Sequence, residues 1–111
     1  MNVEFLPLNV KSLYLNFNKQ KVRVMVDEVG DFWYVARDVA KVLGYRSANE
    51  LTRQVYIAHK GERLFERRAV SVLNKGGLYY LTYRSRKPIA KRFMNWVNSL
   101  EKRKRINDLH Y

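Results

Sequence analysis

The stretch FWYVARDVAKVLGY, residues 32–45, passes from a β-strand pattern into a helical one with no loop between them. Its first five residues are aromatic, β-branched or small apolar types, which are typical of a strand. Apolar residues then recur at helical spacing from Val39 to Leu43, and Asp38 stands near the expected helix start, where the helix dipole favours a carboxylate. Gly44 is placed to end the helix. The stretch therefore predicts a strand that leads directly into a short helix.

The residues before this stretch predict two further strands. Residues 22–26 form a β-rich run that begins with apolar and polar residues in alternation. The acidic segment 27–31 separates it from the run at 32–36, so we expect a hairpin. Residues 13–17 predict an earlier strand, with residues 18–21 as its turn.

Ser47 and Glu50 match the capping box, which predicts the start of the next helix. In that motif the two side chains satisfy each other's free backbone N–H groups at a helix start. We expect this helix to run from about residue 48 to 58, with Leu51 and Val55 on its buried face.

After this helix the sequence predicts a turn, a pair of strands and a third helix. Residues 59–62 read as the turn, and residues 64–65 and 69–73 as the strands. Asn74 is a plausible N-cap for a helix through about residue 84. Gly76 and Gly77 weaken the start of that helix by about 1 kcal/mol each, so we interpret them as close-packing positions.

The last helix begins at Pro88, a residue suited to a first helical position, and carries two regular stripes. The apolar stripe consists of Ile89, Phe93, Trp96, Val97 and Leu100. The polar stripe on the opposite side consists of Lys91, Asn95, Asn98, Lys102 and Arg105. Because solvated helices usually mix charge signs, the absence of acid from the second stripe favours a binding surface over ordinary solvation.

Together these elements predict an α+β fold, a small and mainly antiparallel sheet with three or four packed helices. The chain has 111 residues, which suits one domain, and 47% apolar residues, which suffice for a core. The dense aromatic residues Phe32, Trp33, Tyr34, Phe93 and Trp96 are therefore expected in that core rather than in a ligand pocket.

Positive charge is concentrated in the second half of the chain. The formal net charge is +12, of which +1 falls in residues 1–52 and +11 in residues 53–111. A basic surface of this kind attracts polyanions, and nucleic acid is the densest polyanion in a cell. We find no secretory signal and no membrane-spanning stretch, and we expect a protein of the cell interior without a membrane partner.

Three blocks of the sequence resemble the Bro-N domain, which occurs at the N-terminus of phage antirepressor-like proteins and of the Bro proteins of large DNA viruses. Residues 32–45 resemble its strand-into-helix signature. Residues 73–81, LNKGGLYYL, are similar to its Asn-x-x-Gly-Leu-Tyr-x-Leu motif, and residues 84–97, RSRKPIAKRFMNWV, to its closing helix. The resemblance covers about residues 17–97 and implies a small α+β domain associated with DNA binding and viral or prophage regulation.

The resemblance implies that residues 1–111 form a single Bro-N-like domain, with residues 98–111 as a basic C-terminal extension. After Val97 the chain departs from the Leu-Pro-containing end that family members usually have. Family members also commonly carry a second, variable C-terminal domain. Because this chain stops at Tyr111, we expect that role to be absent or supplied by another protein.

The candidate nucleic-acid-binding residues lie on the last helix, in the turn before it and around the capping-box helix. Lys and Arg neutralise phosphates, and Asn can donate to phosphates or pair with adenine in the major groove. The candidates are Arg84, Arg86, Lys87, Lys91, Arg92, Asn95, Asn98, Lys102, Arg103 and Arg105, together with Arg46 and Arg53. We favour double-stranded DNA as the ligand and leave RNA and single strands open.

The alternative function is that of an antirepressor-type module that captures a repressor or another host protein, since a positive face can also dock onto an acidic protein surface. Homodimerisation also stays open. For Tyr80, which could stack on unpaired bases, we favour a ring at the core edge with its hydroxyl in water.

No catalytic constellation emerges, so we predict a protein that is not an enzyme. Ser85 lacks an adjacent base, and Asp38 has a sufficient structural role at the helix start. His59 and His110 are far apart in sequence and the chain has no cysteine, so we predict no metal and no cofactor.

Overall fold

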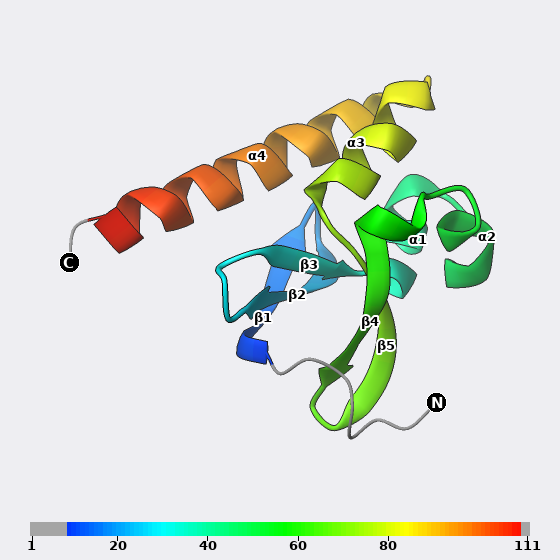
Figure 1. Ribbon diagram of the computed structural model, residues 1–111. Coiled ribbons are helices and arrows are strands. Elements are labelled where there is room, and N and C mark those ends of the chain that lie inside the picture. Colours follow the sequence, from blue (N-terminus) through cyan, green and yellow to red (C-terminus); the bar gives the residue numbers. More distant parts are fainter. Residues whose placement is uncertain (1–8, 110–111) are drawn as a thin grey trace.

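The fold is a five-stranded antiparallel sheet with helices packed against it, which confirms the predicted α+β class (Figure 1). The computed structural model describes the backbone of residues 9–109 and the side chains of residues 11–103. The strands follow the order β1-β2-β3-β5-β4 and every neighbouring pair is antiparallel. The elements are β1 (Asn9–Phe17), β2 (Gln20–Asp27), β3 (Phe32–Val35), α1 (Ala36–Leu43), α2 (Ala48–Thr52), the 3-10 helix η2 (Ile57–His59), β4 (Lys60–Phe65), β5 (Arg68–Leu73), α3 (Lys75–Arg84) and α4 (Pro88–Leu109).

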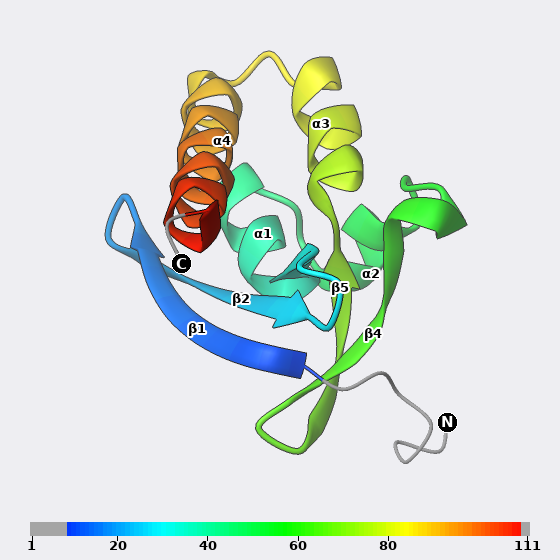
Figure 2. The ribbon, with the colours of Figure 1, turned by 60° about the vertical axis from the view of Figure 1, so that its left-hand side comes forward.

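The main core lies between one face of the sheet and helices α1, α3 and α4 (Figure 2). Strand β2 shows why these residues form a half-buried strand, because Val22, Val24 and Val26 all point into this core at a spacing of two. Phe93 of α4 meets Phe17 of β1 edge to face, with 5.2 Å between the ring centroids. The aromatic pairs of this core hold α4 over the sheet.

A second apolar cluster lies on the other face of the sheet, around Met25, Phe65 and Val72. It is enclosed because the sheet is strongly curved, as the arc of β1 in Figure 2 shows. Tyr14 of β1 and Phe65 of β4 meet edge to face at 5.1 Å between ring centroids, although their strands stand at opposite ends of the sheet order. Curvature therefore brings the two edge strands together.

The five aromatic residues expected in the core divide between these clusters. Phe32, Tyr34 and Phe93 are buried in the main core, as predicted. Trp96 is only partly buried against the main core, and Trp33 against the second cluster. The guanidinium of Arg63 stacks over the Trp33 ring at 4.3 Å from its centroid.

The prediction for residues 48–62 is wrong in two places. Helix α2 ends at Thr52 rather than near residue 58, and residues 60–62 belong to strand β4 rather than to a turn. Strand β4 starts this early because Lys60 pairs with Leu73 and Gly61 with Val72. The Nζ atom of Lys60 also donates to the carbonyl of Thr52 at 2.8 Å, at the end of the shortened helix. Pairing with β5 overrides the local turn preference here.

Two predicted helix boundaries and one predicted close-packing position are confirmed. Gly44 ends α1 in the left-handed conformation, with φ of 82°. Asn74 caps α3 by accepting a hydrogen bond from the Gly77 N–H at 3.1 Å. A Cβ atom at Gly77 would lie 3.1 Å from both the His59 carbonyl oxygen and Val55 Cγ1, which confirms a close-packing position.

The capping box is only half present. The Oγ atom of Ser47 accepts from the Glu50 N–H at 3.1 Å, as expected. The Glu50 carboxylate, however, accepts from the Arg46 N–H at 3.3 Å rather than from Ser47. Its Oε2 atom also lies 3.4 Å from the Nε atom of Arg46, so Arg46 takes the place that the motif assigns to the cap residue.

Candidate nucleic-acid interface

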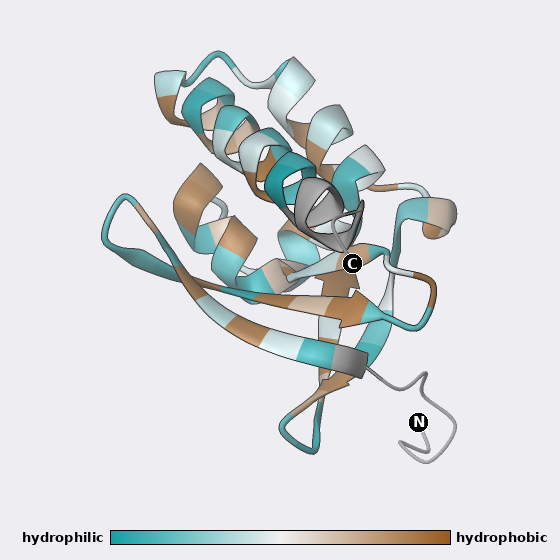
Figure 3. Cartoon of the chain, turned by 90° about the vertical axis from the view of Figure 1, so that its left-hand side faces the viewer, coloured by the Kyte–Doolittle hydropathy of each residue, from teal (hydrophilic) through white to brown (hydrophobic). Residues whose placement is uncertain are grey.

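The outward side of α4 gathers the largest group of predicted site residues. Its inward side is apolar, with Ala90, Phe93 and Val97 buried in the main core. The exposed candidates on this helix are Lys91, Arg92, Asn95, Lys102 and Arg103. Figure 3 shows the hydrophilic colouring that recurs along α4. We call this group of five the α4 surface.

Glu101 is the one carboxylate among the described side chains of α4, and it faces inward. It is only 8% exposed, and it accepts a hydrogen bond from the Tyr34 hydroxyl at 2.8 Å. Burial, reinforced by the neighbouring Glu101, raises the pKa of Tyr34 far above its ordinary value. The described part of α4 therefore directs its one carboxylate to the core, and the α4 surface contains no acid.

Two members of the predicted polar stripe do not belong to the α4 surface as described. Asn98 is half-buried beside α3, where its Oδ1 atom accepts from the Tyr79 hydroxyl at 3.1 Å. Arg105 lies in the helix, but its side chain is outside the described residues. Asn95, by contrast, is exposed and has its amide available for a ligand.

The turn between α3 and α4 holds two candidates, Arg86 and Lys87, of which Lys87 has a structural role. Its Nζ atom donates to the Leu43 carbonyl at 3.2 Å, at the C-terminal end of α1, where the helix dipole favours a cation. Its backbone N–H donates to Ser85 Oγ at 3.2 Å. Arg86 is exposed to solvent. Sequence reasoning could not assign this role because Leu43 is distant along the chain.

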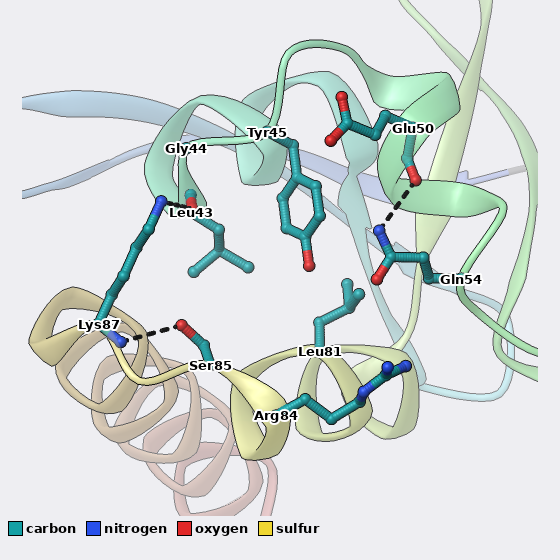
Figure 4. A pocket seen from close by; sticks show the side chains of 9 residues that line it. All are labelled: Leu43, Gly44, Tyr45, Glu50, Gln54, Leu81, Arg84, Ser85 and Lys87. Atoms are coloured by element: carbon teal, nitrogen blue, oxygen red, sulfur yellow. Dashed lines mark hydrogen bonds between the residues drawn. The ribbon is translucent and has the colours of Figure 1, made fainter.

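A cavity of about 290 Å³ lies beside this turn, between it and the ends of α1 and α2 (Figure 4). Leu43 and Leu81 line it with apolar groups, and the hydroxyl of Tyr45 points into it. Glu50 and Arg84 contribute charges of opposite sign. The mixed lining and the engaged Lys87 make this cavity a poor match for a polyanion.

Arg84 belongs to an aromatic cluster at the edge of the molecule. Its Nη1 atom donates to the Tyr80 hydroxyl at 2.7 Å, and its guanidinium lies 5.2 Å from the centroid of that ring. Tyr80 also meets the 71% exposed Tyr56 edge to face. Tyr80 is half-buried, as expected for a ring at the core edge, and its hydroxyl accepts from Arg84 in an exposed hydrogen bond.

Arg46 and Arg53 flank α2, which packs mainly against α1. Arg46 is paired with Glu50, and the Nε atom of Arg53 donates to the Asn49 carbonyl at 3.2 Å. Both side chains stay exposed, but they belong to a part of the molecule distinct from the α4 surface.

Sequence reasoning missed a second group of exposed cations, on α1 and β2. The total charge of residues 1–52 is close to zero, which concealed them. Three of the acids, Asp27, Glu28 and Asp31, gather at the β2–β3 turn, away from Arg37 and Lys41 of α1. The spacing of four between Arg37 and Lys41 on a short amphipathic helix was the available signal.

The described part of the chain holds neither a metal-binding cluster nor a membrane-spanning helix. The side chains that it describes contain no group of three His, Asp or Glu residues able to hold a metal ion. No helix in the described part of the chain is long and apolar enough to cross a membrane.

Comparison with known proteins shows which family of proteins the chain resembles. The model of the family described as "BRO family, N-terminal domain" matches residues 21–102. An "Uncharacterized protein" of Haemophilus influenzae (strain ATCC 51907 / DSM 11121 / KW20 / Rd) is 33% identical over 92 residues, which cover 74% of this chain. The match spans 43% of that relative, so the chain corresponds to less than half of its length. No solved structure matches the chain.

Proposed function

Because the chain belongs to the BRO family of N-terminal domains, a family of phage and viral regulatory proteins, we propose that it binds nucleic acid, with double-stranded DNA as its main ligand. The observation that carries the proposal is the α4 surface, whose cations have no carboxylate among them. The output would be transcriptional control by a virus or prophage inside the host cell. The proposal includes no catalytic step.

The α4 surface suits a phosphate backbone on physical grounds. Lys91 and Lys102 are 11 residues apart, about three helical turns, so they reach phosphates about 16 Å apart along the axis. Each phosphate neutralised by a cation releases counterions, which provides the driving force for binding. Asn95 lies between them and could pair with a base edge, because an α-helix fits the major groove.

The test is a fluorescence anisotropy titration of labelled duplex DNA at several salt concentrations. If about five phosphates are contacted, log K should fall against log salt with a slope of roughly −4 to −5. The variant Lys91→Gln with Lys102→Gln should make that slope shallower by about 2, because each removed cation gives up one phosphate contact. An affinity that barely responds to salt would refute the proposal.

A matched control tests whether binding depends on the α4 surface or only on the net charge of the chain. Lys11 and Lys19 are exposed on β1 and its turn, and replacing both by Gln removes the same charge. This double variant should keep a slope within about half a unit of the parent chain. Equal losses in the two double variants would mean that binding depends on total charge and not on α4.

A second candidate function, docking of a protein partner, is supported by the outward side of α3. Tyr83 is 91% exposed and Tyr79 47%, and Ile57 of η2, which packs beside α3, is 86% exposed. Lys75 lies over the Tyr79 ring at 5.7 Å from its centroid. Exposed tyrosines flanked by cations are typical of protein interfaces.

Nuclease treatment and the substitution Tyr83→Ser distinguish DNA binding from protein capture. A single stoichiometric partner that survives nuclease treatment in a pull-down, and is lost with Tyr83→Ser, would support protein capture. Tyr83→Ser should leave duplex binding within about twofold, since Tyr83 is not on the α4 surface. Analytical ultracentrifugation of the free chain tests whether that partner is a second copy.

A further inference from the structure

A cationic hollow of about 500 Å³ lies where the start of α1 meets strands β1 and β2. It is formed by parts of the chain to which sequence reasoning assigned no ligand. Its main lining residues are Tyr14, Lys21, Arg23, Arg37, Asp38 and Lys41. Four of these six carry a positive charge and one carries a negative charge.

The single carboxylate of the hollow is fully engaged. Asp38 Oδ2 accepts from both the backbone N–H and the Nε atom of Arg23, each at 2.8 Å, and Oδ1 accepts from Arg23 Nη2 at 3.0 Å. The hydrogen bond to Asp38 raises the pKa of Arg23, so this guanidinium keeps its charge. Asp38 therefore balances Arg23 and leaves the other three cations uncompensated.

Those three cations make no ion pair with any described carboxylate. Arg37 and Lys41 lie on the exposed side of α1, and Lys21 is exposed on β2 with its Nζ atom 5.2 Å from the Tyr14 ring centroid. The other acid near the hollow is Glu66, which hydrogen-bonds to Tyr14 and so raises the pKa of that hydroxyl. The balance of these groups remains positive.

Two smaller hollows adjoin this one and share Arg37. One, of about 280 Å³, also contains Arg68 and the exposed Ser71 of β5. The other, of about 350 Å³, also contains Lys41 and Arg46. Arg37 thus lines three hollows, and each of them includes at least one further cation.

This surface is separate from the α4 surface. Helix α1 contacts α4 through the main core, in which Val39 and Leu43 are buried. Arg37 and Lys41 lie on the opposite side of that two-turn helix, facing solvent. One site can therefore be altered while the other is left intact.

We propose that the hollow around Arg37, Lys41 and Lys21 is a second site on this domain, which binds a phosphate group. Guanidinium and ammonium donors that converge on a concave surface match the oxygens of a phosphate, and Arg does so with two parallel hydrogen bonds. The phosphate could come from a nucleic-acid backbone or from a free nucleotide. This proposal does not depend on DNA binding by α4.

The test is an NMR titration of the ¹⁵N-labelled chain with inorganic phosphate, with a nucleoside triphosphate and with a short duplex, in separate arms. All three ligands carry phosphate, so at least one should shift the Arg37 and Lys41 amide and Arg37 Nε signals in a saturable way. Saturation by the nucleotide alone identifies a free nucleotide as the source. Saturation by the duplex alone identifies the nucleic-acid backbone.

Three double variants test whether the ligand-induced signal changes arise from binding at the hollow. Arg37→Gln with Lys41→Gln should weaken binding at the hollow at least about tenfold, because two charge-assisted contacts are lost. The equal-charge control Lys11→Gln with Lys19→Gln should stay within about twofold. Lys91→Gln with Lys102→Gln should leave the Arg37 signals responsive even where it weakens duplex binding. Arg37 signals that move with none of the three ligands, or equal loss in all three double variants, would overturn the proposal.

Discussion

The Nζ atom of Lys87 lies 3.2 Å from the carbonyl oxygen of Leu43, so the residue that precedes α4 caps the C-terminal end of α1. Gly44 makes this contact possible, since a Cβ atom there would lie 2.5 Å from the same Nζ atom. The turn between α3 and α4 is thereby tied to α1. Lys87, a predicted nucleic-acid contact, therefore also stabilises the end of α1.

Replacing Lys87 by Met should lower the free energy of unfolding by about 1 kcal/mol, because the last carbonyls of α1 lose a cationic donor. Urea unfolding measures this change. The neighbouring Arg86→Met removes the same charge from an exposed position and should stay within about 0.5 kcal/mol of the parent chain. Equal stability of the two variants would contradict the capping role.

Asn95 and Asn98 should behave differently although both belong to the predicted polar stripe. Each Asn→Ala variant gains the same helix propensity, so the difference between them isolates the bond from Tyr79 to Asn98. Asn98→Ala should be about 0.5–1.5 kcal/mol less stable than Asn95→Ala. Duplex titrations should show the reverse order, with Asn95→Ala the weaker binder by about fivefold. Identical binding curves would remove Asn95 from the interface.

Tyr34→Phe should destabilise the chain by about 1–3 kcal/mol at pH 8, because Glu101 loses a buried donor. Burial and Glu101 raise the pKa of Tyr34 in the folded state above the ordinary value of 10.0. The unfolded tyrosine therefore ionises first, and the stability that this hydroxyl contributes is complete below pH 10 and declines as the pH rises beyond it.

The measurement is urea unfolding of the parent chain and Tyr34→Phe at pH 8 and pH 11. The stability difference between them should shrink at the higher pH by up to about 1.4 kcal/mol per pH unit above the unfolded pKa. A difference that is constant or larger at pH 11 would show that Tyr34 is not held in its neutral form.

Lys19→Gly should raise the free energy of unfolding by about 0.5–1 kcal/mol, because Lys19 has a φ of 67° in the two-residue turn after β1. With Asn18 retained, the variant has the Asn-Gly pair preferred in such hairpin turns. Thermal unfolding provides the comparison. Lys11→Gly, inside strand β1, should instead lose a similar amount, so a gain in both variants would point to a cause other than the turn.

The parts of the fold that could be predicted are those encoded by neighbouring residues. The end of α1 at Gly44 and the start of α4 at Pro88 follow from local conformational preferences. The burial of Phe93 follows from the apolar period of its helix. These features need no knowledge of the rest of the chain.

The features that could not be predicted depend on partners distant in sequence. Strand β4 extends back to Lys60 because Leu73 is available to pair with it. Asn98 is half-buried, and its Oδ1 atom is engaged by the Tyr79 hydroxyl of the adjacent helix. The exposed cations around Arg37 could not be recognised from the charge of residues 1–52, because three of the acids that balance them in that total lie at the β2–β3 turn. The total charge of a segment does not show where its charged side chains lie in the fold.

The contact between Arg23 and Asp38 bears on how the chain folds. The printed pairing of β2 with β3 stops at Val24 and Tyr34, and the next N–H along β2, that of Arg23, donates to Asp38 instead. The two residues are 15 positions apart, a short loop that costs little entropy to close. The β1–β2–β3 hairpins and the first turn of α1 can therefore assemble as one early unit, onto which β4, β5 and α4 are added later.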